Sequence, residues 1–399
     1  MKKLFCQNCV LHSDVPGVEI NEKGVCSFCS TYKDTDVYEL RLRKVLTKRM
    51  EMLFEKVKAQ PNMYDAVVLF SGGKDSTYLL KLAKEKYGLK VLAISLIHPI
   101  VNETAKKNIE DVVKVIGVDH IGFRIQEEVY INVMKKGILE GEKYGLDEFF
   151  GCSICSFFHF WIPIKIAMKM NIPIILEGSD LGQSGNPIFS EGDQVKQSIT
   201  KGTGPYDNLH KLFNDTLGDE YKNSIYGYDA EEILNGNYPS LLSPFTFLDY
   251  DYKEAMNEIE NMGLQRSSFN KIYTNCSLIP YLSYFTIKKY DCIPYTKQYA
   301  NEIRRNYPML MQLSIDNSHE ENILNKETVE NLINEYKNVI LYIAENKLTK
   351  EQILGSEKEN IIELAPTYIK LYKEKVSDEL ISDLSKIPYY SDLFNIDIY

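Results

Sequence analysis

Cysteine is the first residue type in this chain whose spacing indicates chemistry. The sequence has 399 residues and eight cysteines, and six of the eight form Cys-x-x-Cys pairs. Thiols at this spacing are typical of metal or redox sites rather than of structural disulfides. The pairs are Cys6/Cys9, Cys26/Cys29 and Cys152/Cys155, while Cys276 and Cys292 stand apart.

The first two pairs lie in a short segment, residues 1–34, that is rich in turn-forming residues. Two such knuckles can place four thiolates tetrahedrally around one zinc ion. A segment this short cannot bury a core of its own, so the metal would hold it folded. We therefore predict a structural zinc ribbon whose ligands are Cys6, Cys9, Cys26 and Cys29.

A second chemical signal is the hexapeptide Ser71-Gly72-Gly73-Lys74-Asp75-Ser76, which follows an apolar stretch and opens a helical pattern. A loop at a strand–helix junction directs backbone N–H groups and the positive helix end toward an anion. The glycines allow close approach of the backbone to phosphates, and the lysine and the two serines supply a charge and hydroxyl donors. Asp75 either orients the magnesium that accompanies ATP or caps the helix. The loop lacks the Walker spacing, so a Walker-type site is excluded.

The elements that must position this loop alternate between strand and helix. Short, apolar, β-branched stretches predict strands at 65–70, 91–97, 120–125 and 172–178, with helices between them. Alternation of this kind predicts an α/β fold with a doubly wound parallel sheet covered on both faces. We expect the ribbon at 1–34, a linker helix at 35–60, an ATP-binding domain at 61–315 with a loop-rich insertion at about 185–245, and a helical C-terminal region at 316–399.

The Ser71–Ser76 loop behind a buried strand resembles the signature of the PP-loop ATP pyrophosphatases, the adenine nucleotide alpha hydrolase-like superfamily. The resemblance covers roughly residues 60–300. It implies a Rossmann-like sheet with ATP at the carboxyl ends of the strands. It also implies cleavage of ATP into pyrophosphate and an adenylated substrate. The nucleotide site would comprise Ser71, Gly72, Gly73, Lys74, Asp75 and Ser76 with Gly178.

The ribbon carries two narrower resemblances. Cys9-Val10, Pro16-Gly17 and Gly24-Val25-Cys26 resemble the amino-terminal knuckles of the N-acetyl sugar amidotransferases, PP-loop enzymes of surface-sugar biosynthesis. A zinc ribbon ahead of a PP-loop also resembles the tRNA thiolases that form 2-thiouridine.

One departure from the thiolase pattern bears on the substrate. Many of those enzymes carry a Gly-His-Asn-x-Asp-Asp run after the fourth strand, where this chain reads Gly178-Ser179-Asp180-Leu181-Gly182-Gln183. The paired aspartates are missing, and Asp180 and Glu177 are the nearby carboxylates. This argues against tRNA and favours a small-molecule or carrier-bound substrate.

The third cysteine pair, Cys152/Cys155, lies at the start of a long apolar helix, at the sheet edge where ATP is expected. In the PP-loop sulfurtransferases a pair at this place and one distant cysteine bind a four-iron cluster with an open iron for sulfide. The resemblance thus implies a 4Fe–4S cluster on Cys152, Cys155 and Cys276, with Cys292 as a spare ligand. A second zinc, a redox dithiol or persulfide carrier, and plain core cysteines stay open as alternatives.

Three functions are compatible with these residues. The favoured one is ATP-dependent adenylation of a carbonyl or amide oxygen followed by sulfur transfer, with Cys152, Cys155, Cys276 and Asp180 as catalytic residues, ATP with Mg²⁺ and zinc as cofactors, and a sulfur-donor protein as partner. The second is an N-acetyl sugar amidotransferase that receives ammonia from a partner glutaminase. The third is a non-catalytic nucleotide-binding module, against which the second cysteine cluster argues.

Composition limits the setting in which this chemistry would occur. The net charge of −10, 44% hydrophobic residues and 26% charged residues are ordinary for a soluble globular protein. The acidic balance argues against a dedicated nucleic-acid binder. No apolar run approaches the roughly 20 residues of a membrane span, and the first residues lack the apolar core of a signal peptide. We expect a cytoplasmic enzyme without membrane contact, and a homodimer is the one assembly that we consider.

Overall fold

The computed structural model divides the chain into two compact units. The larger unit comprises Thr35–Leu146 with Phe150–Asn270, and the smaller comprises Met1–Asp34, Asp147–Phe149 and Lys271–Tyr399. The structure describes residues 3–32, 36–98, 101, 103–147, 150–202, 204, 206–264, 286–287 and 289–305, and positions 334, 337, 340, 341, 344 and 345. The smaller unit thus combines the N-terminal segment with residues after 270, and the domain boundary expected near residue 315 stays a prediction.

A six-stranded sheet forms the centre of the larger unit, with the strand order β3-β2-β1-β4-β6-β5. Neighbouring strands pair in parallel except β5, which is antiparallel to β6. The central strands β1 and β4 are buried along their whole length because they are apolar on both faces. This confirms the predicted α/β fold. The strands are β1 (Ala66–Leu69), β2 (Val91–Ile97), β3 (Asp119–Arg124), β4 (Ile174–Leu176), β5 (Ile188–Ser190) and β6 (Ser240–Ser243).

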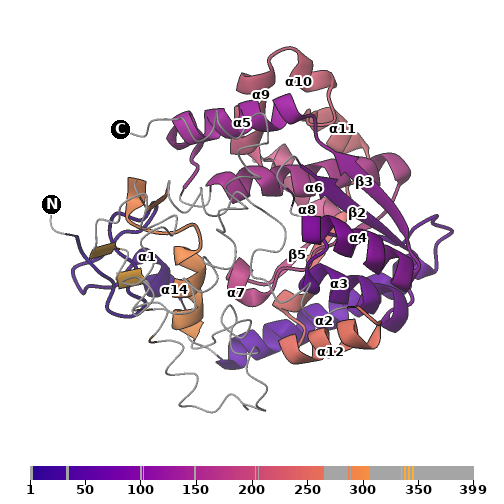
Figure 1. Ribbon diagram of the computed structural model, residues 1–399, viewed down its shortest axis with the longest axis horizontal. Coiled ribbons are helices and arrows are strands. Elements are labelled where there is room, and N and C mark those ends of the chain that lie inside the picture. The colour runs from indigo at the N-terminus through magenta and orange to yellow at the C-terminus, as the bar shows by residue number, and fades with distance from the viewer. Residues whose placement is uncertain are drawn as a thin grey trace. The chain divides into compact units, whose positions relative to one another are not determined.

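Helices cover both faces of this sheet. The crossovers from β1 to β2 and from β2 to β3 run in one direction, and the return from β3 to β4 runs in the other. Right-handed crossovers therefore place α3 and α4 on one face and α6 on the opposite face, as Figure 1 shows. The helices of these crossovers are α3 (Lys74–Lys81) with the π-helical turn η1 (Leu82–Lys86), α4 (Glu103–Ile116), α5 (Glu127–Glu140) with the 3-10 turn η2 (Gly141–Tyr144), and α6 (Phe150–Met170).

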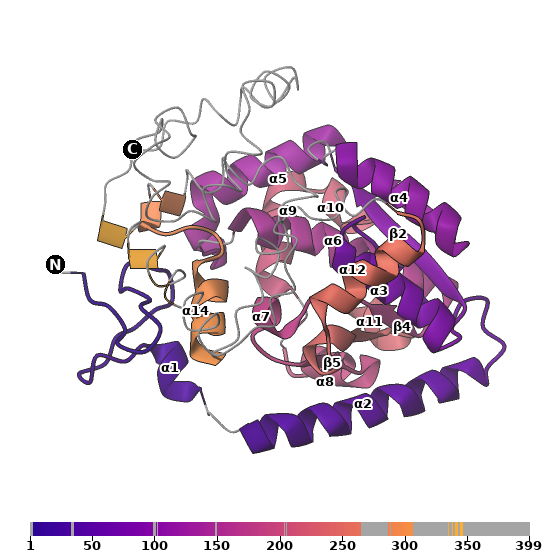
Figure 2. The same cartoon turned by 60° about the horizontal axis from the view of Figure 1, so that its bottom comes forward.

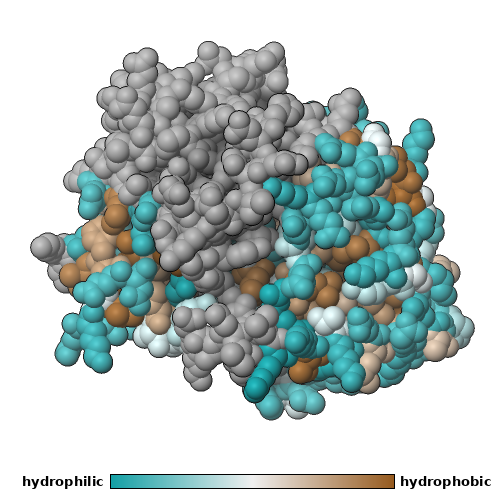
Figure 3. All heavy atoms as spheres, turned by 90° about the horizontal axis from the view of Figure 1, so that it is seen from below, coloured by the Kyte–Doolittle hydropathy of each residue, from teal (hydrophilic) through white to brown (hydrophobic). Residues whose placement is uncertain are grey.

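Helix α6 is the most apolar helix of the described chain, and by length and composition it could cross a membrane. This corrects the expectation from the sequence that no apolar run approaches the length of a membrane span. However, 61% of its 18-residue apolar window is buried inside the larger unit, where Phe157, Phe158 and Trp161 are fully buried. The helix packs against β1, β2 and β4, which is the environment of a core helix. In the view of Figure 3, hydrophilic residues cover much of the described surface, with smaller hydrophobic areas between them.

Helix α2 (Asp36–Lys58) lies within the range, 35–60, where the sequence predicts a linker helix. It runs along the β5 edge of the larger unit, beside α8 (Figure 2). Arg49 pairs with Glu191 at 2.6 Å and stacks its guanidinium over the Phe189 ring. The helix is therefore attached to the sheet unit by side-chain contacts as well as by the chain itself.

The segment expected to be a loop-rich insertion contains two strands as well as short helices. β5 and β6 extend the sheet beyond β4, so the end of this segment belongs to the sheet. Strand β6 is not predicted from the sequence, because Ser-Leu-Leu-Ser is short and lies among polar residues. The helices of this region are α7 (Leu181–Ser184), α8 (Gly192–Thr200), α9 (Asp207–Leu217), α10 (Glu220–Asn223), α11 (Ala230–Asn235), the 3-10 turn η3 (Pro244–Thr246) and α12 (Tyr252–Asn261).

The smaller unit is built from the ribbon and a segment near residue 300. It holds α1 (Ser27–Thr31) and α14 (Thr296–Arg305). His12 Nε2 lies 3.1 Å from the Asp291 carbonyl oxygen, and Lys3 pairs with the Asp291 carboxylate at 2.7 Å. The ribbon is therefore packed on residues that follow it by more than two hundred positions. Most of the predicted helical region at 316–399 lies outside the described residues.

Candidate functional site

The carboxyl ends of β1, β4 and β6 meet at one edge of the sheet. The chain winds from β1 toward β3 on one side and from β4 toward β6 on the other, so the strand order reverses between β1 and β4. Open α/β sheets bind ligands at such a reversal, outside the carboxyl ends of the strands. The Ser71–Ser76 loop follows β1, and residues 177–183 follow β4. Both predicted nucleotide-site segments therefore flank the reversal.

The phosphate loop leaves the start of α3 uncapped by any side chain. Gly73 occupies the N-cap position, with no side-chain hydrogen bond to the first turn. The two serines instead bond within the loop: Ser71 Oγ lies 3.2 Å from Ser76 Oγ, and Ser76 Oγ donates to the Gly73 carbonyl at 3.1 Å. First-turn N–H groups without a capping side chain, at a positive helix end, form an anion site.

Position 72 requires glycine, because both the backbone conformation and the available space exclude a side chain. Its φ is +76°, and a Cβ there would lie 2.6 Å from the Ala105 carbonyl oxygen and 2.9 Å from Ile109 Cγ1. Asn108 of α4 donates its side-chain N–H to the Gly72 carbonyl at 3.0 Å and is buried. Helix α4 therefore holds the loop from the side. Asn108 was not singled out from the sequence, although a polar residue on the apolar face of an amphipathic helix was a usable signal.

Gly178 brings the β4 loop against the phosphate loop. A Cβ on Gly178 would lie 3.1 Å from both the Asp75 carbonyl carbon and the Ser76 nitrogen. The two loops are thus in backbone contact, and their polar groups form one site.

Two buried carboxyl groups follow β4. Because Leu176 pairs with Leu242 in the β4–β6 register, the next residues fall side by side, and Ser243 Oγ donates to Glu177 Oε1 at 2.6 Å. The Ser179 N–H donates to the other Glu177 oxygen at 2.7 Å. Asp180 caps α7 by accepting from the Gln183 N–H at 2.9 Å. Burial raises the pKa of Glu177 above its ordinary value.

Charged residues of the phosphate loop influence the pKa of Asp180 in the β4 loop. Burial, and then the negative charge of Asp75, raise the pKa of Asp180 to about 6, while the charge of Lys74 acts in the opposite direction. Lys74 Nζ contacts Asp75 Oδ1 at 2.5 Å. A lysine and two carboxylates beside a helix start without a side-chain cap can accept a polyphosphate together with a divalent cation. Shifted pKa values of this kind are more common at functional sites than elsewhere.

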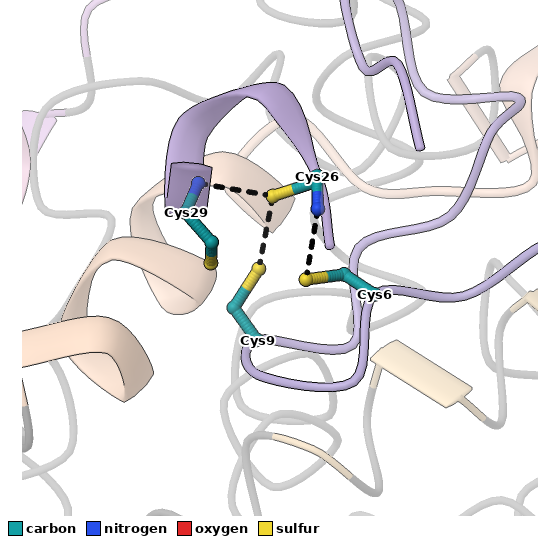
Figure 4. Close-up of side chains that lie close together, drawn as sticks. All are labelled: Cys6, Cys9, Cys26 and Cys29. Atoms are coloured by element: carbon teal, nitrogen blue, oxygen red, sulfur yellow. Dashed lines mark hydrogen bonds between the residues drawn. The ribbon is translucent and has the colours of Figure 1, made fainter. Parts of the chain in front are cut away.

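The four ribbon cysteines converge as predicted. Their Sγ atoms all lie within 4.8 Å of one another, and Figure 4 shows the four side chains pointing toward a common centre. Cys9 Sγ and Cys26 Sγ are 3.6 Å apart, close to the spacing of about 3.8 Å that tetrahedral ligation by Zn–S bonds of about 2.3 Å requires. The donor set and geometry therefore fit zinc.

Backbone and side-chain groups surround these sulfurs. The Cys26 N–H donates to Cys6 Sγ and the Cys29 N–H donates to Cys26 Sγ, each at 3.3 Å. The hydrogen bond from Cys9 and, against burial, the hydrogen bond and charge of Arg304 lower the pKa of the Cys29 thiol to about 5. Arg304 belongs to α14, so the later segment supplies a positive charge to the thiolate cluster.

Cys152 and Cys155 lie in the first two turns of α6, and both are half-buried. Cys155 Sγ lies 3.2 Å from the Tyr130 hydroxyl. The Tyr130 ring stacks on His98, the residue directly after β2, with ring centroids 5.4 Å apart. Through Tyr130, Cys155 is therefore connected to the carboxyl edge of the sheet. Burial, and then the charge of His159, lower the pKa of His98 to about 3, so its ring is neutral.

The cluster prediction depends on a residue outside the described part of the chain. Cys276 falls among the residues that the structure does not describe, and Cys292 belongs to the smaller unit, where it is buried. Within the described residues, the ribbon is the one group of three or more cysteine, histidine or carboxylate ligands that converges on a metal position. The 4Fe–4S cluster on Cys152, Cys155 and Cys276 stays a prediction.

Comparisons with known proteins give one sequence relative and several distant structures. No family model matches the chain. The uncharacterized protein MJ1599 of Methanocaldococcus jannaschii is 25% identical over 214 residues, which is 53% of this chain and 72% of the relative.

Three solved structures are similar at 10% to 14% identity. They are the U34-tRNA thiolase NcsA from Methanococcus maripaludis with its 4Fe–4S cluster (14% identity, 87% of this chain and 92% of that one, TM-score 0.34), the NMN synthetase from Francisella tularensis (10%, 77% and 98%, 0.33) and the NH3-dependent NAD synthetase from Campylobacter jejuni (14%, 76% and 95%, 0.34). Their TM-scores are too low to assign a shared function, so the function rests on the geometry of this chain.

Proposed function

We propose that this chain is an ATP-dependent adenylating enzyme that cleaves ATP to AMP and pyrophosphate. The observation that carries the proposal is the backbone contact of Gly178 with Asp75 and Ser76, which joins an uncapped helix start to the Asp180 loop at the sheet reversal. The N–H groups of the α3 start would hold the two terminal phosphates, and Lys74 would neutralise part of their charge. Asp75 and Asp180 would orient the magnesium ion.

The chemistry requires positioning more than covalent catalysis. An oxygen of the substrate attacks the α-phosphorus, and pyrophosphate leaves with the bonding electron pair. The resulting adenylate is then displaced at carbon by a nucleophile, and AMP leaves with the substrate oxygen. The phosphate loop fixes the leaving group, so the reacting atoms can be held in line.

Product analysis tests this step. Incubation of the purified chain with Mg-ATP and candidate acceptors should release pyrophosphate and AMP, whereas Ser76→Ala should release far less. Formation of ADP and phosphate would contradict the proposal, because ATP would then be cut between its β- and γ-phosphates and no adenylate could form.

For the second step we propose sulfur as the nucleophile. Its support is the position of Cys155, which contacts Tyr130 beside the carboxyl end of β2. A persulfide on Cys155, loaded by a sulfur-donor protein, would attack the adenylate at carbon as AMP leaves. The Cys152 thiol would then attack the Cys155 sulfur of the resulting disulfide, which releases the thiolated product and leaves a Cys152–Cys155 disulfide. The alternative is ammonia from a partner glutaminase, which rests on the resemblance of the ribbon knuckles to those of the sugar amidotransferases. The small or carrier-bound substrate and the cytoplasmic location remain part of this proposal.

A pair of substitutions separates the two nucleophiles. If sulfur is transferred through a Cys155 persulfide, Cys155→Ala should abolish product formation with a persulfide-carrying sulfur donor while ATP binding survives. If ammonia is the nucleophile, Cys155→Ala should retain ammonia-dependent product formation. Anaerobic purification followed by a visible spectrum and iron, zinc and sulfide analysis would show whether the α6 cysteines hold a cluster.

A further inference from the structure

An aromatic stack lies directly behind the phosphate loop. Tyr250, in the turn between η3 and α12, stacks on Phe245 with ring centroids 4.4 Å apart, and Phe245 stacks on Tyr78 of α3 at 5.7 Å. All three side chains are buried. The stack fixes the plane of the Tyr250 ring, so its hydroxyl has little freedom to move.

The Tyr250 hydroxyl is directed into the charged pair of the loop. It donates to Asp75 Oδ1, the same oxygen that Lys74 Nζ contacts at 2.5 Å. Lys74 Nζ also lies 3.4 Å from the Tyr250 oxygen and 5.7 Å from its ring centroid. Tyr250 therefore contacts both members of an ion pair that must rearrange when a phosphate arrives.

Arg43 of α2 fixes the turn that carries Tyr250. Its guanidinium donates to the carbonyls of Phe247 and Leu248 at 3.2 and 2.8 Å, and to the Asp249 carboxylate at 2.8 Å. These are the three residues immediately before Tyr250. The planar fork of an arginine can hold several acceptors in one fixed arrangement.

We propose that Tyr250 is a positioning residue of the phosphate loop, and that Arg43 sets the place of Tyr250 from helix α2. The inference rests on the proposed function, in which this loop binds the polyphosphate of ATP. The tyrosine hydroxyl donates a hydrogen bond to the Asp75 carboxylate, and this hydrogen bond weakens the ion pair between Asp75 and Lys74. Without the hydroxyl, Asp75 pairs more tightly with Lys74, and an incoming phosphate must compete for the ammonium group.

Calorimetric binding of three probes tests the proposal: Mg-ATP, Mg-pyrophosphate and AMP. Tyr250→Phe keeps the stacked ring and removes the hydroxyl. We expect it to bind Mg-ATP and Mg-pyrophosphate about ten-fold more weakly, as for loss of a hydrogen bond to a charged group. AMP has no terminal phosphates for the loop to hold, so its affinity should not change.

Matched variants exclude a general loss of structure. Tyr78→Phe removes a hydroxyl from the same stack, but that hydroxyl is bonded to Glu254, so binding should stay normal. Arg43→Met should weaken Mg-pyrophosphate binding in the same sense as Tyr250→Phe. Arg49→Met, on the same helix but paired with Glu191, should not.

The outcomes distinguish the inference from the function on which it rests. Equal affinities of wild type and Tyr250→Phe for Mg-pyrophosphate would overturn the inference alone. An equal loss of AMP affinity would also overturn it, because the substitution would then disturb the whole site. If the wild-type chain binds neither Mg-ATP nor Mg-pyrophosphate, the proposed function fails first and the inference fails with it.

Discussion

Gly178→Ala is the substitution that most directly tests whether the two loops form one site. Gly178 needs no unusual backbone conformation, so alanine adds no torsional strain there. The added methyl group would instead meet backbone atoms of Asp75 and Ser76 at 3.1 Å. Because backbone cannot rotate away as a side-chain end can, the start of α3 must shift by a few tenths of an ångström.

The size of the effect follows from this overlap. Overpacking usually costs about 1–3 kcal/mol, and a shift this small belongs at the lower end, about 1 kcal/mol. In a domain of roughly 200 residues that lowers the melting temperature by about 2–4 °C. The shift also misaligns the N–H groups at the helix start, whose interaction with an anion is worth about 1 kcal/mol. Mg-ATP affinity should therefore fall about five-fold.

Calorimetry with Mg-ATP and a thermal melt measure both effects, and Gly122→Ala is a suitable control. A methyl group on Gly122 would meet Ile97 Cδ1 at 3.1 Å, but that atom is the end of a flexible side chain on the β3 side of the sheet, so neither quantity should change. If Gly178→Ala binds Mg-ATP as the wild type does while its melting temperature falls, the β4 loop is not part of the nucleotide site.

Three further predictions concern the metal, the buried carboxyl group and the loop glycine. Cys26→Ser/Cys29→Ser should lose one equivalent of zinc by mass spectrometry while Mg-ATP binding by the sheet unit persists; unchanged zinc content would contradict the ribbon. Asp180→Asn should raise the melting temperature near pH 8 but not near pH 4. The folded pKa of Asp180, about 6, lies above its ordinary value of 3.8, so its ionisation costs up to about 3 kcal/mol, present above about pH 6 and absent below about pH 4. A gain that is equal at both pH values would refute this reasoning. Gly72→Ala should destabilise the fold by at least about 2 kcal/mol in urea, because it combines a left-handed backbone with a clash against the Ala105 carbonyl; a smaller loss would mean that α4 can move away from the loop.

Local pattern was enough to locate the phosphate loop and the ribbon. Ser71–Ser76 sits between a continuous apolar run and an amphipathic segment, and both signals lie within a dozen neighbouring residues. The four ribbon cysteines likewise converge within a segment of 24 residues, from Cys6 to Cys29.

Contacts made across the sheet could not be predicted in the same way. Tyr250 reaches Asp75 across a sequence separation of 175 residues, and it does so because the short strand β6 pairs with β4. Since β6 was hidden in a polar stretch, the residues that follow it were not expected at the site. The burial of Asp180 was also invisible, because a single aspartate in a Gly-Ser-Asp-Leu run is as typical of an exposed helix cap.

The pairing of the ribbon with Asp291 and Arg304 has a consequence for the order in which the chain can assemble during synthesis. The four ribbon cysteines all lie within the first thirty residues, so a metal bound by them would organise the ribbon as soon as it leaves the ribosome. Its packing surface, however, is translated more than two hundred residues later, since Lys3 and Asp291 are 288 positions apart. The sheet unit lies between the ribbon and Asp291 in the sequence, so it can fold before the packing surface of the ribbon has been synthesised. A ribosome that stalls before Asp291 would therefore release a protein with the ribbon cysteines and a complete sheet but no finished smaller unit.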